Sequence, residues 1–552
     1  MFNFIRIKSR KGMATLIALM VMLMMTLIGL AALQITEDEI TIAGNELNEM
    51  SAFYAAESGL ERASASIQEQ YSKTNAPPTQ LPAGNENISQ KTITTYVTND
   101  MGAATQKTLT QGTVAGLKAL VKTYQIESIG TSLVDGSQMR LSQNFECALV
   151  PIFQFAVFYD NDLEISPGPK MTITGRVHTN GDLWLNPYDD LNITDYVTCA
   201  GDIHHGPGGS YASIRKGDIY IKDNTGTYQN MKNANGTFLQ SSDANWYESA
   251  SARWGGRVQD AAFGQEELNM PITSSDPRKI IERYDGGSNP DSYEQKAEAK
   301  IIDGAYLVKI GSVWQDVSSL LPSGTITTGG FYDYREKTNV VTTDIDMNLL
   351  KTSSYFPSNG VIYSSDQRTG TFNALRLQNA SDIGNPLSIF SENPMYVQGD
   401  YNTVNKQPAA LAGDAITFLS NSWNDANASS SSSPFWNRNP SATTCNASII
   451  TGNTEMTSTV DNGGLENLLR YLEDWDYNIK YTINGSIVNL WHSKEAVGAW
   501  KVGSPVYTPP VRDYSYDTDL DDPNKLPPET PQIQIFQRTG WRQLDVGYTQ
   551  SN

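Results

Sequence analysis

The sequence predicts an α+β fold that is mostly β, with one long N-terminal helix followed by a β-rich region. Residues 13–36 carry no charge, and no proline occurs in residues 1–76. Past Thr74 the chain is rich in Gly, Asn, Ser and Thr, a composition typical of short strands and turns. A recurring Gly–polar cassette between apolar stretches predicts a right-handed parallel β-helix with insertions. A β-sandwich with Gly-Asp hairpin turns is the alternative.

Charge and cysteine content narrow the class of protein. The chain has 552 residues, enough for more than one core, and 40 Lys and Arg against 60 Asp and Glu give a net charge of −20. Such a surface repels phosphate backbones, so we expect no nucleic-acid partner. Cys147, Cys199 and Cys445 allow at most one disulfide, and their spacing matches no zinc motif. Small buried apolar residues are the simpler interpretation.

The uncharged stretch is long enough to cross a membrane. As a helix, its 24 residues rise about 36 Å, against a hydrocarbon core of about 30 Å. Basic residues precede it (Arg6, Lys8, Arg10 and Lys11), and such residues stay in the cytoplasm. The bulk of the chain is therefore expected outside. A cleaved secretory signal and an ordinary single-pass anchor are the competing interpretations.

After Thr36 the apolar positions change to helical spacing without a break. They form two stripes: Ile40, Leu47, Met50 and Tyr54 in one, and Phe53, Leu60 and Ile67 in the other. Gly44 is the weak point, because glycine costs about 1 kcal/mol relative to alanine in a helix. We predict one helix over residues 13–72.

Three short motifs in this region point to a family: Lys11-Gly12, IAGN (42–45) and AFYAAESGL (52–60). With these motifs, residues 7–65 resemble the N-terminal domain of PilX-type minor pilins. The resemblance implies a prepilin leader (1–12), cut after Gly12 by prepilin peptidase to leave Met13 as the methylated first residue. It also implies a helix that packs in the membrane or filament, with residues Ile17, Gly29, Phe53, Tyr54 and Glu57.

One residue departs from the pattern of major pilins, which carry glutamate as the fifth mature residue, where this chain has Ile17. A carboxylate in hydrocarbon is costly unless paired. In pilins its partner is thought to be the free amine of a neighbouring subunit. A subunit with isoleucine cannot neutralise a neighbour above it, so we hypothesise a position at the pilus tip.

The exported part divides by texture into three regions. Predicted strands at 93–98, 121–131, 139–150 and 154–159 give a small pilin-like α+β head over 85–160. Residues 161–510 are predicted to form the β-rich domain, with an insertion at about 225–345, and 511–552 an extended proline-rich segment. We also predict helices at 277–284 and 463–475 and a hairpin at 305–317.

The cassette defines the predicted β-helix. Its copies are Gly181-Asp182, Gly201-Asp202, Gly217-Asp218, Gly399-Asp400 and Gly413-Asp414. The first spacings, 20 and 16 residues, are close to the length of one rung, and the longer gaps require inserted loops. Each copy is expected to place an aliphatic residue inside the coil.

Candidate metal ligands occur at two places. On neighbouring rungs, His178 and His204 would lie about 4.8 Å apart and could bind a metal with Asp182 or Asp202. Asp160, Asp162 and Glu164 alternate in a loop, as calcium ligands do, and residues 517–522 are similarly acidic. Solvated turns and surface histidines are the simpler interpretation, so no cofactor is expected, with Ca²⁺ as the one open candidate.

The motifs favour a structural role over catalysis. The sequence has no G-x-S-x-G elbow, P-loop or HExxH motif, and we expect no enzyme. The resemblance implies a minor pilin-like subunit acting in pilus assembly, with other minor and major pilins, prepilin peptidase and the inner membrane as partners. Aromatic residues such as Trp184 in polar stretches suit adhesion to a surface glycan or protein receptor. A tip pseudopilin of type II secretion and a membrane-tethered β-helical carbohydrate-active enzyme are the alternatives.

Overall fold

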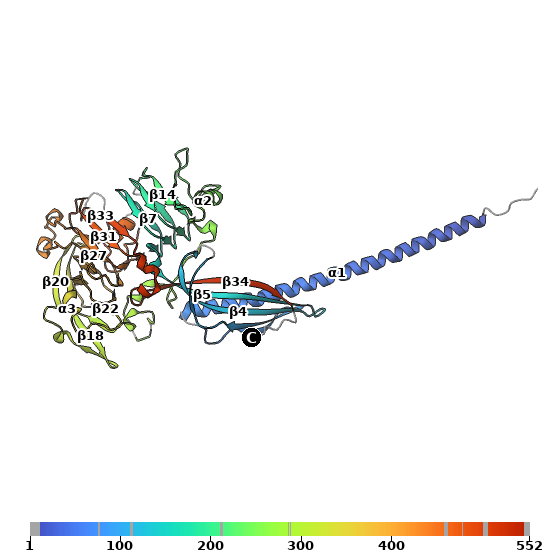
Figure 1. Ribbon diagram of the computed structural model, residues 1–552, viewed down its shortest axis with the longest axis horizontal. Coiled ribbons are helices and arrows are strands. Elements are labelled where there is room, and N and C mark those ends of the chain that lie inside the picture. Colours follow the sequence, from blue (N-terminus) through green and yellow to red (C-terminus); the bar gives the residue numbers. More distant parts are fainter. Residues whose placement is uncertain are drawn as a thin grey trace, which may run out of the picture.

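The computed structural model describes residues 11–74, 78–110, 114–209, 213–284, 286–287, 289–456, 462–476, 478–500 and 506–545. It contains one long helix, a small antiparallel sheet packed on the end of that helix, and a larger stack of short parallel strands (Figure 1). The predicted fold class, α+β and mostly β, is confirmed. We call the helix-bound sheet the head and the stack from β6 to β33 the solenoid.

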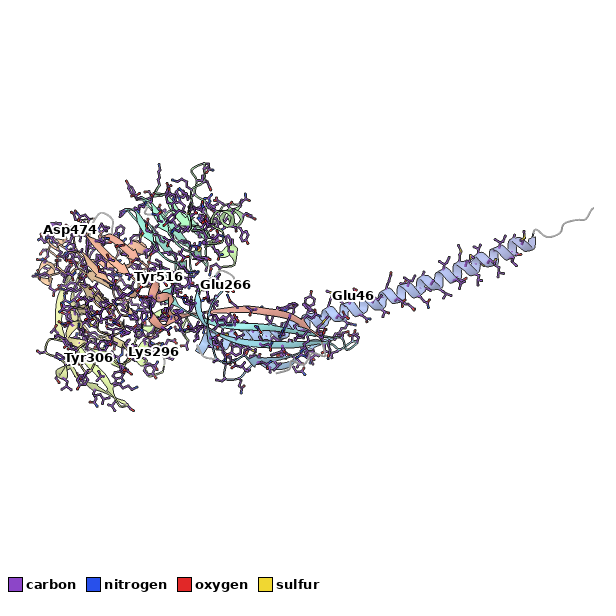
Figure 2. All side chains as sticks on the ribbon, in the orientation of Figure 1. Glu46, Glu266, Lys296, Tyr306, Asp474 and Tyr516 are labelled. Carbon is purple, nitrogen blue, oxygen red and sulfur yellow. The ribbon has the colours of Figure 1, made fainter. Side chains whose placement is uncertain are left out.

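Helix α1 (Lys11–Thr74) is uninterrupted for 64 residues, about 96 Å. Its first half projects alone from the head, and Glu46, labelled in Figure 2, lies on this exposed part. Its second half packs on the head sheet through one stripe of buried residues: Ala52, Ala56, Leu60, Ala63, Ile67 and Tyr71. Of the two predicted stripes, the one containing Leu60 and Ile67 therefore packs on the head, and the other stays exposed.

The head sheet has the order β1-β2-β4-β5-β34, with β3 paired to β4, and all its pairs are antiparallel. Its strands are β1 (Ala83–Ser89), β2 (Thr92–Asp100), β3 (Thr105–Thr108), β4 (Lys118–Ser132), β5 (Gln138–Pro151) and β34 (Gln532–Leu544). The head is thus completed by the C-terminal region. Residues 511–552, expected to be an extended segment, contain β33 and this last head strand instead.

Small residues let the helix lie unusually close to the sheet. A Cβ placed on Gly130 of β4 would lie 1.9 Å from the carbonyl oxygen of Ala52 and 2.5 Å from the backbone nitrogen of Ala56. A Cβ on Gly59 would lie 2.2 Å from the hydroxyl of Ser128. The small positions of the AFYAAESGL motif therefore face the sheet and set the distance between the two layers.

The first block of the solenoid consists of three-stranded rungs. Its strands are β6 (Val157–Tyr159), β7 (Leu163–Ile165), β8 (Met171–Ile173), β9 (Val177–Thr179), β10 (Leu183–Leu185), β11 (Leu191–Ile193), β12 (Val197–Cys199), β13 (Ile203–His205) and β14 (Ile219–Lys222). Parallel pairing aligns Leu163, Leu183 and Ile203, which are buried at a period of 20 residues. The Gly217-Asp218 cassette stands before β14 at a different corner, so its 16-residue spacing is not a rung.

The second block continues the same construction with longer loops. Its strands are β22 (Val361–Ser365), β23 (Phe372–Gln378), β24 (Leu387–Ser391), β25 (Met395–Gln398), β26 (Ala409–Gly413), β27 (Ile416–Leu419), β28 (Thr443–Cys445), β29 (Ser448–Thr451), β30 (Arg470–Tyr471), β31 (Lys480–Asn484), β32 (Ile487–Asn489) and β33 (Val511–Ser515). Leu411 pairs with Ile449 and Ile449 with Ile487, so these two rungs are 38 residues long. All these sheets pair in parallel, which agrees with a β-helix and not with a β-sandwich.

The two blocks join in an order that differs from the chain order. The largest sheet runs β16-β12-β9-β6-β32-β29-β26-β24-β22-β17, and Ile487 of β32 pairs in parallel with Val157 of β6. The chain therefore enters the solenoid near its middle, winds to one end, crosses to the other end and winds back to the middle. Figure 1 shows the early block and the late block on opposite sides of the point where the head attaches.

The chain leaves and re-enters the head at one place. Pro151, the last residue of β5, pairs with Gln532, the first residue of β34. The whole solenoid is thus an insertion between two neighbouring head strands. It lies at the end of the head opposite the free part of α1 (Figure 1).

Residues 225–345, predicted as an insertion, both cap and extend the solenoid. They contain β15 (Tyr228–Asn230), α2 (Trp246–Trp254), β16 (Val258–Gln259), β17 (Ala299–Ile302), β18 (Ala305–Ile310), β19 (Val313–Asp316) and β20 (Ile326–Asp333), and β21 (Thr338–Asp346) crosses their end, followed by α3 (Met347–Leu350). β17 and β21 pair in parallel with β22 and β23, so they are solenoid strands. β18 and β19 form the predicted hairpin.

Two predicted helices are wrong in extent. At 277–284 the structure has only a short 3-10 helix, η4 (Pro277–Ile280), and at 463–475 only α4 (Leu465–Leu468), followed by β30. Leu468 and Leu469 are both buried in the main core, while Leu472 is buried in a separate one. Burial on both sides favours extended chain over a helix with one apolar face. The other 3-10 helices are η2 (Ile152–Gln154), η3 (Ala261–Phe263), η5 (Tyr293–Gln295), η6 (Ser318–Leu320), η7 (Asp425–Ala428), η8 (Phe435–Asn437), η9 (Thr518–Asp521) and η10 (Pro523–Lys525).

Candidate functional site

The free half of α1 is the first candidate site, because its apolar side chains contact nothing else in the described chain. It is long and apolar enough to cross a membrane by length and composition, and none of its most apolar window is buried. Ile17 is 56% exposed, and a Cβ added to Gly29 would meet no atom within 4 Å. An apolar surface of this size is costly in water. It therefore requires a lipid or protein environment.

The motif residues at the end of this surface divide between the head and the exterior. Phe53 is half-buried against the head core, and its ring centroid lies 6.3 Å from that of Trp541 on β34. Tyr54 is 59% exposed, and Glu57 is half-buried on the flank of the helix. Met13 is exposed, Gly12 belongs to α1, and leader residues 1–10 lie outside the described residues.

The structure does not bring His178 and His204 together. In the parallel register, His178 of β9 pairs with Thr198 of β12, and His204 of β13 pairs with Trp184 of β10. The two histidines therefore belong to different sheets, and the predicted alignment of their strands was wrong. The 20-residue period aligns each strand with its counterpart one full rung later, which a match of short motifs does not capture.

His178 is a core residue. It is fully buried, with Nδ1 2.8 Å from the Thr198 hydroxyl and Nε2 3.0 Å from the side-chain oxygen of Asn180. Burial lowers the pKa of His178 to about 4, although the bond to Asn180 opposes this shift. The imidazole is therefore neutral near pH 7. His204 instead stacks on Trp184 at a ring distance of 4.0 Å.

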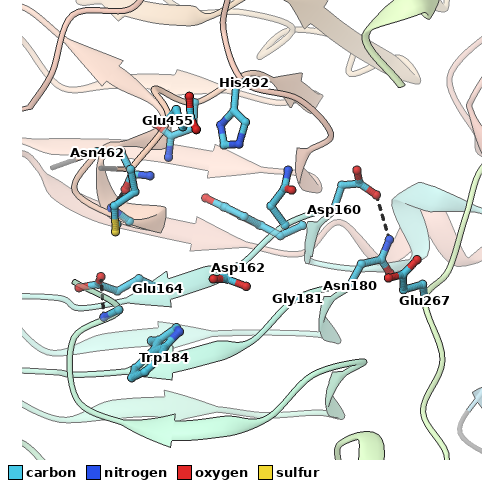
Figure 3. Close-up of a pocket in the computed structure, with 16 residues that line it drawn as sticks. Asp160, Asp162, Glu164, Asn180, Gly181, Trp184, Glu267, Glu455, Asn462 and His492 are labelled. Atoms are coloured by element: carbon cyan, nitrogen blue, oxygen red, sulfur yellow. Dashed lines mark hydrogen bonds between the residues drawn. The ribbon is translucent and has the colours of Figure 1, made fainter. Parts of the chain in front are cut away.

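The carboxylates Asp160, Asp162 and Glu164 line a cavity of about 410 Å³ beside the junction of the two solenoid blocks (Figure 3). Burial raises the pKa of Asp160, against the effect of its hydrogen bond from Asn180, 2.9 Å long. Asp162 accepts the backbone N–H of Asp182 at 2.9 Å, and Asp182 accepts that of Asp202 at 2.8 Å. These aspartates thus also support the corner of each rung.

The other lining residues come from distant parts of the chain. They include Tyr159, Glu267, Glu455 and His492. No local motif marks them, because only the pairing of β32 with β6 brings these segments to one place. Within the described residues, no group of three or more His, Cys, Asp or Glu side chains is arranged to hold a metal ion. The carboxylates line the cavity without converging on one point.

The remaining sequence candidates have structural partners. Asp517 and Asp519 form ion pairs with Lys406 at 2.7 and 2.9 Å, which accounts for part of the acidic 517–522 segment. All three cysteines are buried and free, so no disulfide forms, and burial raises the pKa of each thiol. Of the tryptophans in polar stretches, Trp246, Trp254 and Trp423 are buried and Trp436 is exposed.

The long helix with a free apolar half and a head packed on its other half defines a membrane-anchored, pilin-like N-terminal module. Residues 11–61 match the family model described as PilX N-terminal. The chain therefore carries a PilX N-terminal domain, which confirms the resemblance seen in the sequence. The match covers the helix and none of the solenoid.

Two further comparisons add little. The chain is similar to the competence-associated pilin ComZ from Thermus thermophilus, with 13% identity over 90% of this chain and 97% of that one and a TM-score of 0.29. At this score the likeness supports no conclusion. No curated protein sequence matches the chain.

Proposed function

We propose that the protein is a minor pilin-like subunit that takes part in the assembly of a type IV pilus. The match of residues 11–61 to the PilX N-terminal family carries this proposal, and the free apolar half of α1 supports it. After removal of the leader, the helix would hold the subunit in the inner membrane and then pack beside the helices of other pilins. The head and solenoid would lie on the outer side.

A position at the tip follows from two features. Ile17 offers no carboxylate to a neighbour above, as its place in the helix would otherwise allow. The solenoid lies at the end of the head away from the free helix, across the direction of α1 (Figure 1). A subunit stacked above would have to occupy that space. Both features suit a subunit that ends the filament and presents its solenoid to a surface.

A tip pseudopilin of a type II secretion system is the second candidate, since Ile17 would suit the end of that filament equally well. The two differ in the machine that they initiate. Deleting the gene in its host should reduce pili and leave secretion intact under the first proposal. The reverse result would assign the protein to secretion.

The mature N-terminus provides the direct test. Mass spectrometry of the protein from its host should find Met13 as an N-methylated first residue. An intact leader, or cleavage inside the apolar stretch near Ala32, would contradict the pilin assignment. Immunogold labelling of the solenoid should mark pilus ends, and labelling along the whole shaft would exclude the tip position while leaving the assembly role in place.

A further inference from the structure

The cavity beside the junction of the solenoid blocks has an unbalanced charge. Five carboxylates line it, and its lining includes no Lys or Arg: Asp160, Asp162, Glu164, Glu267 and Glu455. Figure 3 shows Asp162, Glu164 and Trp184 along one side of this space and Glu455 and His492 along another. Elsewhere in the solenoid, buried or crowded acids have cationic partners, as Asp414 has Arg278 at 2.9 Å. An uncompensated group of carboxylates favours a cationic ligand.

The arrangement does not suit a bare metal ion. Calcium requires six to eight oxygens at 2.3–2.6 Å from one point. The described carboxylates of this cavity lie along its sides and form no such group. A volume of about 410 Å³ is also many times that of one water molecule, about 30 Å³ in the liquid. The space and the spread of charge fit an organic cation with several polar groups.

A buried hydroxyl in the lining indicates a missing hydrogen-bond partner. Tyr159 is 2% exposed, lines the cavity, and its hydroxyl has no hydrogen-bond partner among the residues that the structure describes. Leaving a buried polar group unpaired costs about 1–3 kcal/mol. A ligand hydroxyl that accepts from Tyr159 would remove this cost. The pairing of β32 with β6 holds the tyrosine here, at the end of β6.

We propose that this cavity binds an amino sugar that carries a free ammonium group. The ammonium would donate to the carboxylates, and the sugar hydroxyls would bond to Tyr159 and to lining amides such as Asn161 and Asn453. A lysine side chain fits less well, because its aliphatic stem needs an apolar wall and the lining is mostly Asp, Glu, Asn and Gly. The inference gives a ligand class to the surface contact proposed above and rests on that proposal for its biological purpose.

Binding is measured by isothermal titration calorimetry on the full-length protein in a sugar-free zwitterionic detergent, at pH 6 and low salt. The probe is the glucosamine trimer, and the matched ligand control is its fully N-acetylated form, which has no ammonium group. We expect the trimer to bind and the acetylated trimer to bind at least about tenfold more weakly. Raising the salt concentration should weaken the trimer alone.

Two variants test the residues. Glu267→Gln should weaken the trimer about threefold to tenfold, whereas Glu266→Gln, one residue away and outside this lining, should leave the affinity unchanged. Tyr159→Phe removes a hydroxyl that has no printed partner in the described chain, so the unfolding midpoint should hold while affinity falls about fivefold. A structural role alone would not separate these two readouts.

Several results would overturn the inference. Equal affinity for the acetylated trimer would show that charge is not recognised, and equal effects of Glu266→Gln and Glu267→Gln would place binding elsewhere. Calcium that binds alone and displaces the trimer would indicate a metal site, and tighter binding of a lysine-rich peptide would indicate a protein ligand. None of these outcomes affects processing of the N-terminus, so failure here is distinguishable from failure of the pilin proposal.

Discussion

The close approach of α1 to the head sheet gives the sharpest prediction, the substitution Gly130→Ala. The added Cβ would lie 1.9 Å from a backbone oxygen and 2.5 Å from a backbone nitrogen of the helix. Real Cβ atoms do not come within 3.0 Å of such atoms, so helix and strand must separate by about 1 Å. Neither neighbour is a side chain that can rotate away.

Separation loosens every contact of the buried helix stripe. Overpacking usually costs about 1–3 kcal/mol, and a clash with backbone on both elements belongs at the upper end. A loss of about 3 kcal/mol in the local free energy of opening makes amide exchange about a hundredfold faster. Hydrogen–deuterium exchange with mass spectrometry, on the full-length protein in detergent, should show this acceleration in residues 52–71.

Gly44→Ala is the matched control. A Cβ at Gly44 would meet no atom within 4 Å, and alanine is the better helix former by about 1 kcal/mol. This variant should leave exchange in residues 52–71 unchanged. If Gly130→Ala also left it unchanged, the close packing of helix on sheet would be wrong, and with it the explanation of the small residues in AFYAAESGL.

Three further predictions concern the solenoid and the thiols. Burial raises the pKa of Glu473 to about 7 from 4.5, so the folded state holds a proton that the unfolded state has lost, and the free energy of unfolding should fall by about 3 kcal/mol as pH rises from 4.5 to 7. Chemical denaturation of Glu473→Gln at both pH values should lack this part of the decline, and an identical decline in both proteins would refute the assignment. Arg278→Met leaves the buried Asp414 carboxylate without its cation and should cost about 3–5 kcal/mol by tryptophan-monitored denaturation, whereas Lys279→Met, at a more exposed ion pair, should cost less than about 1 kcal/mol. The three buried cysteines should not react with a thiol reagent in the native protein and should all react once it is denatured; rapid labelling of the native protein would contradict their burial.

Local patterns were sufficient for the helix and for the rung. The absence of charge and proline, followed by helical spacing, predicts α1 because a helix forms all its backbone hydrogen bonds within one segment. The Gly-Asp repeat at 181 and 201 predicts stacked rungs because each corner recurs at a constant distance along the chain. The 463–475 segment shows the limit of such patterns, since a leucine spacing that fits a helix also fits extended chain buried on two sides.

The candidate site was only partly predictable. Asp160, Asp162 and Glu164 were singled out by their alternation and do line a cavity. The pairing of His178 with His204 failed because register, set by the stacking of whole rungs, decides which residues are neighbours. Tyr159 gave no signal in the sequence, since an unpaired hydroxyl is a property of its surroundings.

The amino-acid sequence by itself determined the anchor, the character of the head strands and the repeating unit of the solenoid, because each depends on residues close together in the chain. Only the tertiary structure decided that β34 returns to complete the head, that β32 stacks on β6, and that a carboxylate-lined cavity lies beside this junction. These contacts join segments more than 300 residues apart. Their free energy comes from burying apolar faces and pairing strand edges that many other orders of the same rungs could also satisfy.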